Sequence, residues 1–288
     1  RKDHAKKQNY PHKQPRQLLG AFVRDTIPLP YGTMSLALTR RSKQMPDARA
    51  DPMQTAPDGG RVRWAVRPVS FTVLVIVIST VAGIGGRYWV RGDFDVIHAL
   101  LILFFSTNLW ISYWEICLYF KRDHIERRAA YWRRRRQETG RPPAIEFLTG
   151  KVPLAKMLSP ALWADVWATY AQIDGSYADR RTYGYIVDIG NGFLTPVPTL
   201  VLYAAFTFDF LPAPTAGIIG VMLFWQLTFG TSLYWVSFFL AKRHTRLSRR
   251  EICIYIWTLN SPWLLFALLG LHVSIRLIVD GDYSVLGY

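Results

Sequence analysis

Five long apolar runs separated by strongly basic segments constrain the fold of this chain more than any other feature. A helix needs about 20 predominantly apolar residues to cross the hydrocarbon core of a bilayer. The runs lie at about Val69–Val90, Val96–Phe120, Tyr183–Phe208, Thr215–Leu240 and Ile252–Val279. We therefore predict an all-α integral membrane protein, folded as a bundle of five transmembrane helices.

The composition excludes several other classes of protein. The chain has 288 residues, a net charge of +15 and 50% hydrophobic residues, and the charges fall between the apolar runs. A nucleic-acid-binding protein would also be basic, but it would not carry these runs, so we expect no nucleic-acid partner. Cys117 and Cys253 form no CxxC pair, and the sequence has no P-loop, GxSxG, HExxH or dinucleotide fingerprint. We expect neither a metal nor a cofactor.

The runs divide the chain into four parts. Because the chain begins with Arg, Met34 is a plausible start of translation. Within the third part, the amphipathic segment Leu162–Tyr177 is rich in Trp and Tyr, and we expect it to lie at the membrane interface. The parts are a basic, disordered N-terminal segment (1–66), transmembrane helices 1–2 (67–120), a basic cytoplasmic loop (121–182) and transmembrane helices 3–5 (183–280).

The distribution of Lys and Arg predicts the orientation. Residues 1–67 hold 14 of them, residues 121–182 hold 13, and residues 242–250 hold five. The alternate connections hold only Arg87, Arg91 and Arg276. Since connections rich in Lys and Arg stay on the cytoplasmic side, we expect a cytoplasmic N-terminus and a C-terminus on the opposite side. The membrane would be the endoplasmic reticulum in a eukaryote, or the inner or plasma membrane in a bacterium.

Three strongly polar residues, Glu115, Asp188 and Asn260, lie well inside the apolar runs. Ionisable groups at this depth are costly and often mark functional sites. At 1.5 Å per residue, the three lie about 9, 10 and 15 Å from the nearest basic flank, with Trp263 one turn further. All four fall in the cytoplasmic half of three different helices, which predicts one shared cavity.

Polar neighbours at helical spacing extend these positions into two helix faces. The faces are Asn108, Ser112 and Glu115 on the second run, and Tyr185, Asp188, Asn191 and Thr195 on the third. One interpretation is that these groups only hydrogen-bond to one another and lock the bundle. The other is catalytic: two acids in one low-dielectric cavity repel when both are ionised, so we expect one protonated and one charged carboxyl. Such a pair can move a proton across a substrate.

Short motifs in order along residues 95–275 resemble a known family. The segment Trp167–Tyr177 matches W-x-x-Y-A-x-x-D-x-x-Y, which includes Asp174, and the fifth run carries N-x-x-W as Asn260 and Trp263. The fourth run carries a Leu-Tyr pair that ends in Tyr234. These motifs resemble those of the emopamil-binding protein (EXPERA) superfamily, which includes a hydroxysteroid double-bond isomerase and the sigma-2 receptor.

The resemblance implies a cavity for a sterol-like or isoprenoid lipid, with Asp174 and Tyr234 at the site. Glu115 and Asp188 fall where the isomerase has its second-span and third-span glutamates, and they would act as acid and base. Trp263 would face a carbocation, and Asn260 would position a carboxylate. Two positions depart from the isomerase: Ile111 stands where it has His, and Asp188 is shorter than Glu.

Three functions therefore stay open. The first is a cofactor-free isomerase that shifts a double bond. The second is a non-catalytic lipid-binding or chaperone protein of the sigma-2 receptor type. The third, a transporter or proton relay, is disfavoured because we find no internal duplication. The expected partners are a hydrophobic lipid and the membrane. The sequence is also compatible with a homodimer.

Overall fold

Long apolar helices dominate the computed structural model, which describes residues 64–288. The interpretation of the first 63 residues, including Met34, lies outside this range. Four helical segments are long and apolar enough to cross a membrane: α2 (Pro68–Arg91), α3 (Val96–Phe120), α9 (Ala213–Leu240) and the stretch Arg249–Asp280. A fifth span results if α7 (Tyr183–Leu194) and α8 (Pro196–Phe208), which meet at 48°, count as one. The chain is thus an all-α, multi-pass membrane protein.

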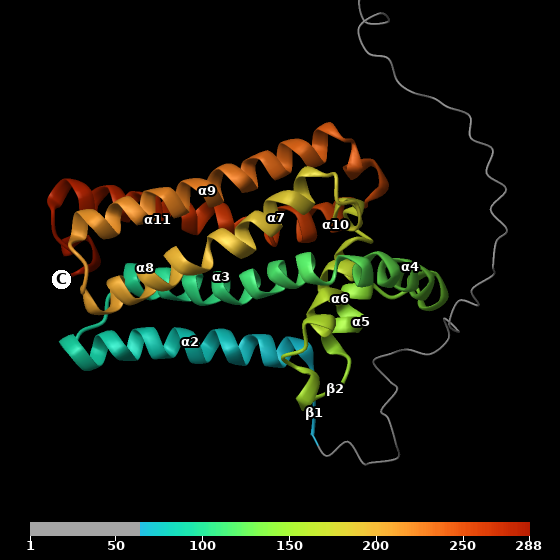
Figure 1. Cartoon of the computed structure of the whole chain (residues 1–288), viewed down its shortest axis with the longest axis horizontal. Coiled ribbons are helices and arrows are strands. Elements are labelled where there is room, and N and C mark those ends of the chain that lie inside the picture. The colour runs from blue at the N-terminus through green and yellow to red at the C-terminus, as the bar shows by residue number, and fades with distance from the viewer. Residues whose placement is uncertain (1–63) are drawn as a thin grey trace, which may run out of the picture. The chain divides into compact units, whose positions relative to one another are not determined.

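The other elements range from two-residue strands to the 19-residue helix α11, which together with α10 and η4 makes up the stretch Arg249–Asp280. Six of them lie between α3 and α7, and Figure 1 shows α4, α5 and α6 together at the end of the bundle opposite the C-terminus. They are β1 (Ala65–Val66), α4 (Arg122–Thr139), α5 (Pro143–Thr149), β2 (Val152–Pro153), η1 (Leu154–Lys156), α6 (Pro160–Tyr170), η2 (Gly175–Ala178), η3 (Arg243–Arg246), α10 (Arg249–Glu251), the π-helix η4 (Ile252–Thr258), α11 (Pro262–Asp280) and η5 (Ser284–Leu286). The strands β1 and β2 form one antiparallel pair, with Ala65 opposite Pro153.

Local chemistry sets where the long helices begin and end. Proline occupies the first turn of α2, α6, α8, α9 and α11, where its missing N–H breaks no helical hydrogen bond. Asp95 caps α3 by accepting a hydrogen bond of 2.7 Å from the backbone N–H of His98. Gly92 ends α2 with a φ of 73°, a left-handed conformation that glycine adopts without a steric penalty.

Two spans are interrupted by irregular backbone. α7 and α8 are separated at Thr195, because Pro196 has no N–H to continue the α7 hydrogen-bond pattern. In the last span, α10 leads into the π-helix η4, and α11 begins only at Pro262. The apolar runs predict both spans, and they contain the prolines, but they do not predict the π-helix. Such irregular turns often lie at functional sites.

Small residues allow α9 and α11 to pack closely along their length. A Cβ added at Gly217 would lie 2.6 Å from the carbonyl oxygen of Ser274, and one at Gly220 would lie 2.1 Å from the Ser274 hydroxyl. A ring of Phe224 fills the corresponding space at Gly270. These glycines bring the two backbones together, as small residues commonly do between helices in membranes.

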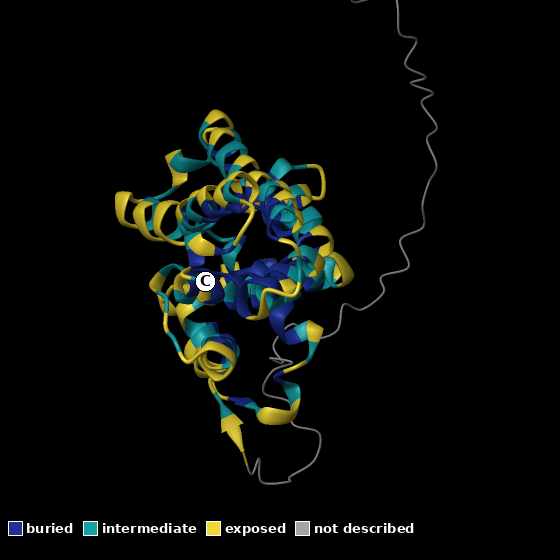
Figure 2. Cartoon of the chain, turned by 90° about the vertical axis from the view of Figure 1, so that its left-hand side faces the viewer, coloured by how far each residue is buried: buried dark blue, intermediate teal, exposed yellow. Residues whose placement is uncertain are grey.

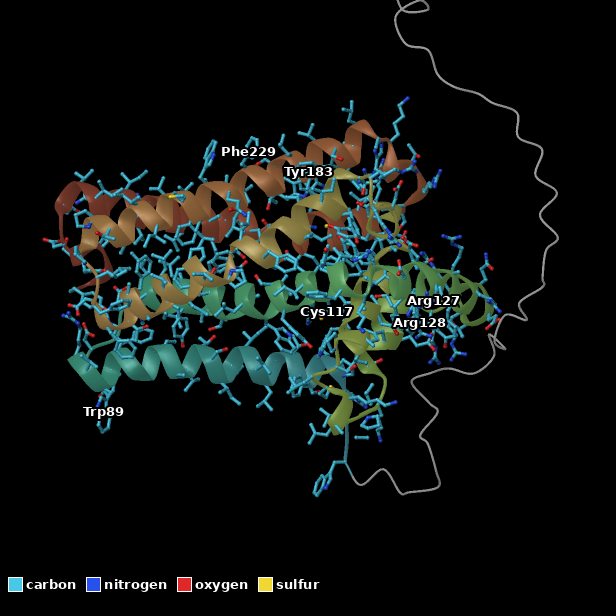
Figure 3. All side chains as sticks on the ribbon, in the orientation of Figure 1. Trp89, Cys117, Arg127, Arg128, Tyr183 and Phe229 are labelled. Carbon is cyan, nitrogen blue, oxygen red and sulfur yellow. The ribbon has the colours of Figure 1, made fainter. Side chains whose placement is uncertain are left out.

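The segment 121–182, predicted as a loop with an interfacial part, folds into helices that pack on the bundle. Arg128 of α4 holds Asp165 of α6 in a buried two-pronged ion pair, with nitrogen–oxygen distances of 2.7 and 2.9 Å. Trp163 and most of α6 are buried inside the protein instead of lying along its surface. The aromatic residues therefore form a core between α3, α4 and α6. Figure 3 shows Arg127 and Arg128 at this end and Trp89 at the other.

Apolar side chains also cover the outside of the bundle. Figure 2 shows the exposed positions on the outer faces of the helices and the buried ones between them. On α2, Val73, Val77, Ile78 and Val81 are all about half exposed or more. A soluble protein rarely presents so large an apolar surface to water, whereas lipid tails solvate it well. Burial thus agrees with helix length in indicating a membrane protein.

Candidate functional site

A cavity of about 450 Å³ lies between the long helices and the helices of segment 121–182. This volume falls within the range of about 300–1,000 Å³ that is typical of small-molecule sites. The side chains around it are mainly aromatic and aliphatic, with a few polar groups. The main lining residues are Thr107, Ile111, Trp114, Glu115, Phe147, Trp167, Tyr170, Tyr177, Asp188, Asn191, Thr231, Tyr234, Tyr255, Asn260 and Trp263.

The four residues that depth arithmetic assigns to one cavity do line it together. They are Glu115, Asp188, Asn260 and Trp263. Three separate helical segments supply them, so the structure brings the four predicted residues together around one cavity. Asn191 and Tyr234 also line the cavity. Among the predicted site residues, Asn108, Ser112, Asp174 and Tyr185 lie outside its wall.

Glu115 and Asp188 lie near each other because α7 approaches α3 very closely. A Cβ added at Gly192 would lie 2.7 Å from the Cβ of Glu115 and 2.9 Å from the backbone nitrogen of Ile116. Glu115 is almost fully buried, and Asp188 acts on it electrostatically. Only a glycine at position 192 lets the two backbones meet at this depth.

Neutral side chains, not cations, surround the two carboxyls. Asn191 and Ser112 lie beside Glu115, and Tyr177 lies beside Asp188. Neither Glu115 nor Asp188 forms an ion pair with any residue in the range 64–288. The site therefore holds two acidic groups in a medium of low polarity without a compensating positive charge.

Asn260 stabilises the irregular backbone of the last span. Its amide nitrogen donates hydrogen bonds of 3.0 Å to the carbonyls of Tyr255 and Ile256, which the π-helix leaves without regular partners. The Tyr170 hydroxyl donates to the Tyr255 carbonyl at 2.9 Å, and the indole of Trp235 to that of Ile256 at 3.0 Å. Side chains thus satisfy the carbonyls of the break and fix the cavity wall there.

Asn108 and Ser112 act behind the cavity wall. The indole nitrogen of Trp263 donates to the Asn108 side-chain oxygen at 3.1 Å, and the Asn108 amide donates to Thr199 at 3.1 Å. The hydroxyls of Ser112 and Thr195 lie 3.0 Å apart. Thr195 in turn donates to the Asn191 carbonyl. This network orients the Trp263 ring and ties α3 to the break between α7 and α8.

Asp174 supports the cavity from the basic end without lining it. It is fully buried, accepts from the Ser176 backbone N–H at 2.9 Å, and accepts from the Tyr234 hydroxyl at 3.1 Å. Arg243 pairs with it at 3.2 Å. Asp174 therefore fixes the Tyr234 ring, which faces the cavity. Tyr185 is buried, and its hydroxyl has no partner among the described residues.

Sequence reasoning did not assign Trp114, Trp167, Tyr170 and Tyr177 to the site, although the last three belong to the matched motif. The indole of Trp167 donates to the Trp114 carbonyl at 2.7 Å, and its ring stacks on Tyr177 with centroids 5.0 Å apart. Burial raises the pKa of Tyr170 to about 12 and raises the pKa of Tyr177 well above its usual value. Both hydroxyls therefore keep their protons at neutral pH and can donate hydrogen bonds.

The arrangement limits the chemistry that the cavity can support. Within residues 64–288 no cluster of three or more His, Cys, Asp or Glu side chains could hold a metal ion. Ile111 lines the cavity as an apolar side chain. Two adjacent acids in an aromatic cavity suit proton transfer or the capture of a positively charged centre.

Comparisons with known proteins do not place the chain in a family. No protein-family model, curated protein or solved structure matches it.

Proposed function

We propose that this chain is an EXPERA-like membrane protein that binds a sterol-like or isoprenoid lipid in the cavity and shifts a double bond within it. The observation that carries the proposal is the position of Glu115 and Asp188 on one aromatic wall, without a cationic partner in the described range. In this proposal the pair α7–α8 forms one bent span, so the bundle has five. The N-terminus is cytoplasmic, and the cavity lies in the cytoplasmic half of the membrane.

The proposed reaction uses one protonated and one ionised carboxyl. The protonated acid gives its proton to one carbon of the double bond, which leaves a carbocation on the neighbouring carbon. The carboxylate then removes a proton from the next carbon, and those electrons form the new double bond. Substrate and product have the same atoms, and the two carboxyls have exchanged protonation states. A proton then passes back between them before the next turnover.

The residues around the acids support this chemistry. The rings of Trp263, Trp167 and Tyr177 surround the space where positive charge would develop, and an aromatic face stabilises a cation. Asn191 lies beside Glu115, and Tyr177 lies beside Asp188, so each acid has a neutral polar neighbour. The apolar remainder of the wall suits a hydrocarbon body and excludes water.

The direct test combines lipid analysis with isotope incorporation. The full chain is purified in mild detergent, and its bound lipids are identified by mass spectrometry. These lipids are then incubated with protein in deuterated water. We expect a double-bond isomer that carries one solvent deuterium, and no such product with Glu115→Gln. Turnover retained in both Glu115→Gln and Asp188→Asn would overturn the acid–base assignment.

A second candidate function is non-catalytic lipid binding or chaperoning, as in the sigma-2 receptor branch. Ile111 favours it, because this side chain lines the cavity where the isomerase has a His. In that case the carboxyls hold a polar or positively charged group of the ligand, and no bond changes. The same experiment separates the two functions, since a binding protein releases its lipid unaltered and without deuterium.

A further inference from the structure

A second, smaller cavity of about 200 Å³ adjoins the main one at the end of the bundle where α4 and α10 meet. Ala144, Thr169 and Tyr255 line both cavities. The two volumes are therefore neighbours that share side chains in their walls. The complete lining of the second cavity is Arg136, Pro142, Pro143, Ala144, Ile145, Thr169, Ile173, Arg250, Glu251, Ile254 and Tyr255.

The two cavities differ in the sign of their charge. The charged residues that line the main cavity are acidic, Glu115 and Asp188. Those that line the second are Arg136, Arg250 and Glu251, so positive charge exceeds negative. A molecule that spans both cavities would therefore meet an apolar, acidic space at one end and a basic one at the other.

The arginines of the second cavity are available to a ligand. Arg136 donates to Glu251 through one terminal nitrogen, at 2.7 Å. Arg250 is exposed and forms no ion pair or hydrogen bond within the described part of the chain. Glu251 is also held by Ser248, whose backbone N–H donates to it at 2.9 Å. Two guanidinium groups at one mouth, one of them unengaged, are well suited to bind an anion.

The surrounding sequence strengthens this field. Arg133, Arg134 and Arg135 precede Arg136 on α4, and Arg246 and Arg249 lie close to Arg250 in sequence. A concentration of one sign of charge around a cavity raises the local concentration of ligands of the opposite sign. The apolar side chains of Pro142, Pro143 and Ile254 would contact the part of the ligand that joins its anionic head to its hydrocarbon body.

We propose that the ligand of the main cavity is an anionic amphiphile, whose phosphate or carboxylate head lies in the second cavity against Arg136 and Arg250. Its hydrocarbon body passes Ala144, Thr169 and Tyr255 into the main cavity. The inference rests on the lipid-binding function proposed above and narrows the class of lipid. An uncharged sterol would leave both arginines without a ligand partner.

Three probes with one isoprenoid body test the inference: farnesyl phosphate, farnesoic acid and farnesol. Binding to the full chain in neutral detergent is measured by isothermal titration calorimetry. We expect the phosphate or the carboxylate to bind about tenfold more tightly than the alcohol, as charge-assisted hydrogen bonds imply. The phosphate and carboxylate arms show which anion the site prefers.

Four variants locate the effect. Arg136→Gln and Arg250→Gln should each reduce the preference for the anion several-fold, while farnesol binding stays unchanged. Arg134→Gln, on an exposed position of α4 outside the lining, is the matched control for lost surface charge and should reduce the preference far less than either of these two variants. Glu251→Gln keeps an acceptor for Ser248 but removes the competing charge, so it should tighten anion binding about threefold.

Three results would overturn the inference, and they differ in what they imply for the proposed lipid-binding function. If wild-type protein binds farnesol and farnesyl phosphate equally, the basic subsite is wrong, but a lipid-binding cavity stands. If none of the three probes binds, both this inference and the proposed function fail for isoprenoid ligands. An anion preference that is lost as strongly in Arg134→Gln as in Arg136→Gln would assign the binding to the general surface and would also overturn the subsite.

Discussion

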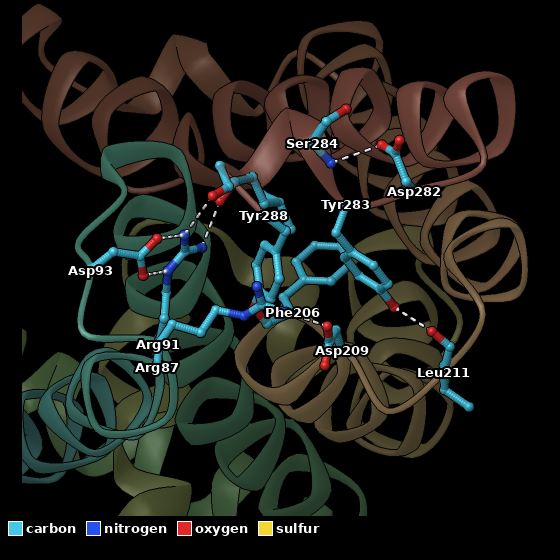
Figure 4. A network of polar contacts seen from close by, with 12 residues as sticks. Arg87, Arg91, Asp93, Phe206, Asp209, Leu211, Asp282, Tyr283, Ser284 and Tyr288 are labelled. Atoms are coloured by element: carbon cyan, nitrogen blue, oxygen red, sulfur yellow. Dashed lines mark hydrogen bonds and ion pairs between the residues drawn. The ribbon is translucent and has the colours of Figure 1, made fainter.

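Two clusters of buried charged groups, one at the C-terminal end of the bundle and one at the cavity, differ in how their charges are paired. At the end that carries the C-terminus, Arg87 is almost fully buried and holds Asp93 through nitrogen–oxygen contacts of 2.8 and 2.9 Å (Figure 4). Its remaining nitrogen donates to the Leu286 carbonyl at 2.6 Å, and its guanidinium lies 4.5 Å from the centre of the Tyr288 ring. Arg91 pairs with Asp209 beside the same ring. We call Arg87, Arg91, Asp93, Asp209 and Tyr288 the Arg87 cluster.

At the cavity, the charged groups have the same sign and no such partners. Glu115 and Asp188 are neighboured by amides, hydroxyls and aromatic rings, and they face an open volume. The Arg87 cluster links the α2–α3 connection, the end of α8 and the C-terminal residues. Attraction between its opposite charges holds these three segments together. Like charges around a cavity stabilise nothing by themselves. This difference supports the proposal that the cavity acids act on a ligand.

The largest effect should follow the loss of one cavity acid. Glu115→Gln should lower the rate of the proposed double-bond shift by about 100-fold or more, since general acid–base groups contribute that much. Its thermal stability should not fall, because a neutral amide is easier to bury than a carboxyl. Turnover and thermal unfolding are measured on the same detergent preparation. Glu138→Gln, exposed on α4, is the control, and wild-type turnover in Glu115→Gln would contradict the assignment.

The next effect concerns the close approach of α7 and α3. Gly192→Ala should separate the helices at Glu115, because the new Cβ would lie 2.7 Å from the Glu115 Cβ. We expect a loss of about 1–3 kcal/mol in stability, typical of overpacking, together with weaker lipid binding. Gly190→Ala on the same helix has nothing within 4 Å and should leave both properties unchanged. Equal behaviour of the two variants would show that the close approach is unimportant.

Loss of the Arg87 cluster should lower the thermal stability without changing lipid binding. Arg87→Gln removes the charge that binds Asp93 and the C-terminal carbonyls, so the midpoint of thermal unfolding should fall by several degrees. Lipid affinity should stay at the wild-type value, because the cluster is at the other end of the bundle (Figure 1). Arg276→Gln, which breaks a half-exposed ion pair with Asp280, should lower the midpoint of thermal unfolding by less than Arg87→Gln does. A loss of lipid affinity in Arg87→Gln would contradict the separation of the two ends.

The smallest expected effect is a pH dependence at the same cluster. The hydrogen bond from Arg87 holds the pKa of the Asp93 carboxyl below its usual value. A lowered pKa in the folded state adds stability above the unfolded pKa, and this stability is lost as the pH falls through the folded pKa. As the pH is lowered from 6 to about 3, the midpoint of thermal unfolding should therefore fall less steeply in Asp93→Asn than in wild type. Identical slopes would contradict the role of this ion pair.

Much of the fold can be predicted from the apolar runs. The second run, Val96–Phe120, coincides with α3, and the third covers α7 and α8 together with the proline break. The boundaries follow because a span needs a fixed length of apolar residues, and prolines and basic flanks end it. The segment 121–182 could not be predicted in this way. Its helices depend on tertiary contacts such as the pair of Arg128 and Asp165, which no local pattern in the sequence indicates.

The site could be predicted in outline. Helical rise was enough to predict that Glu115, Asp188, Asn260 and Trp263 line one cavity, because helices convert sequence distance into length. The sequence does not predict how a helix is rotated about its own axis. Tyr185 was therefore grouped with Asp188, although it lies outside the cavity. Which neighbour a glycine meets is also invisible in the sequence. Nothing in the sequence around Gly192 indicates that this residue contacts α3.

The most direct test of the central claim is photo-crosslinking with an isoprenoid probe that carries a diazirine, followed by peptide mapping. We predict labelling within residues 107–115 of α3 and 258–263 of the last span that an excess of unlabelled probe abolishes. Labelling of the exposed face of α2, where Val77 and Val81 point outward, should not be displaced. Displaceable labelling at the Arg87 cluster, with none at the cavity peptides, would contradict the account.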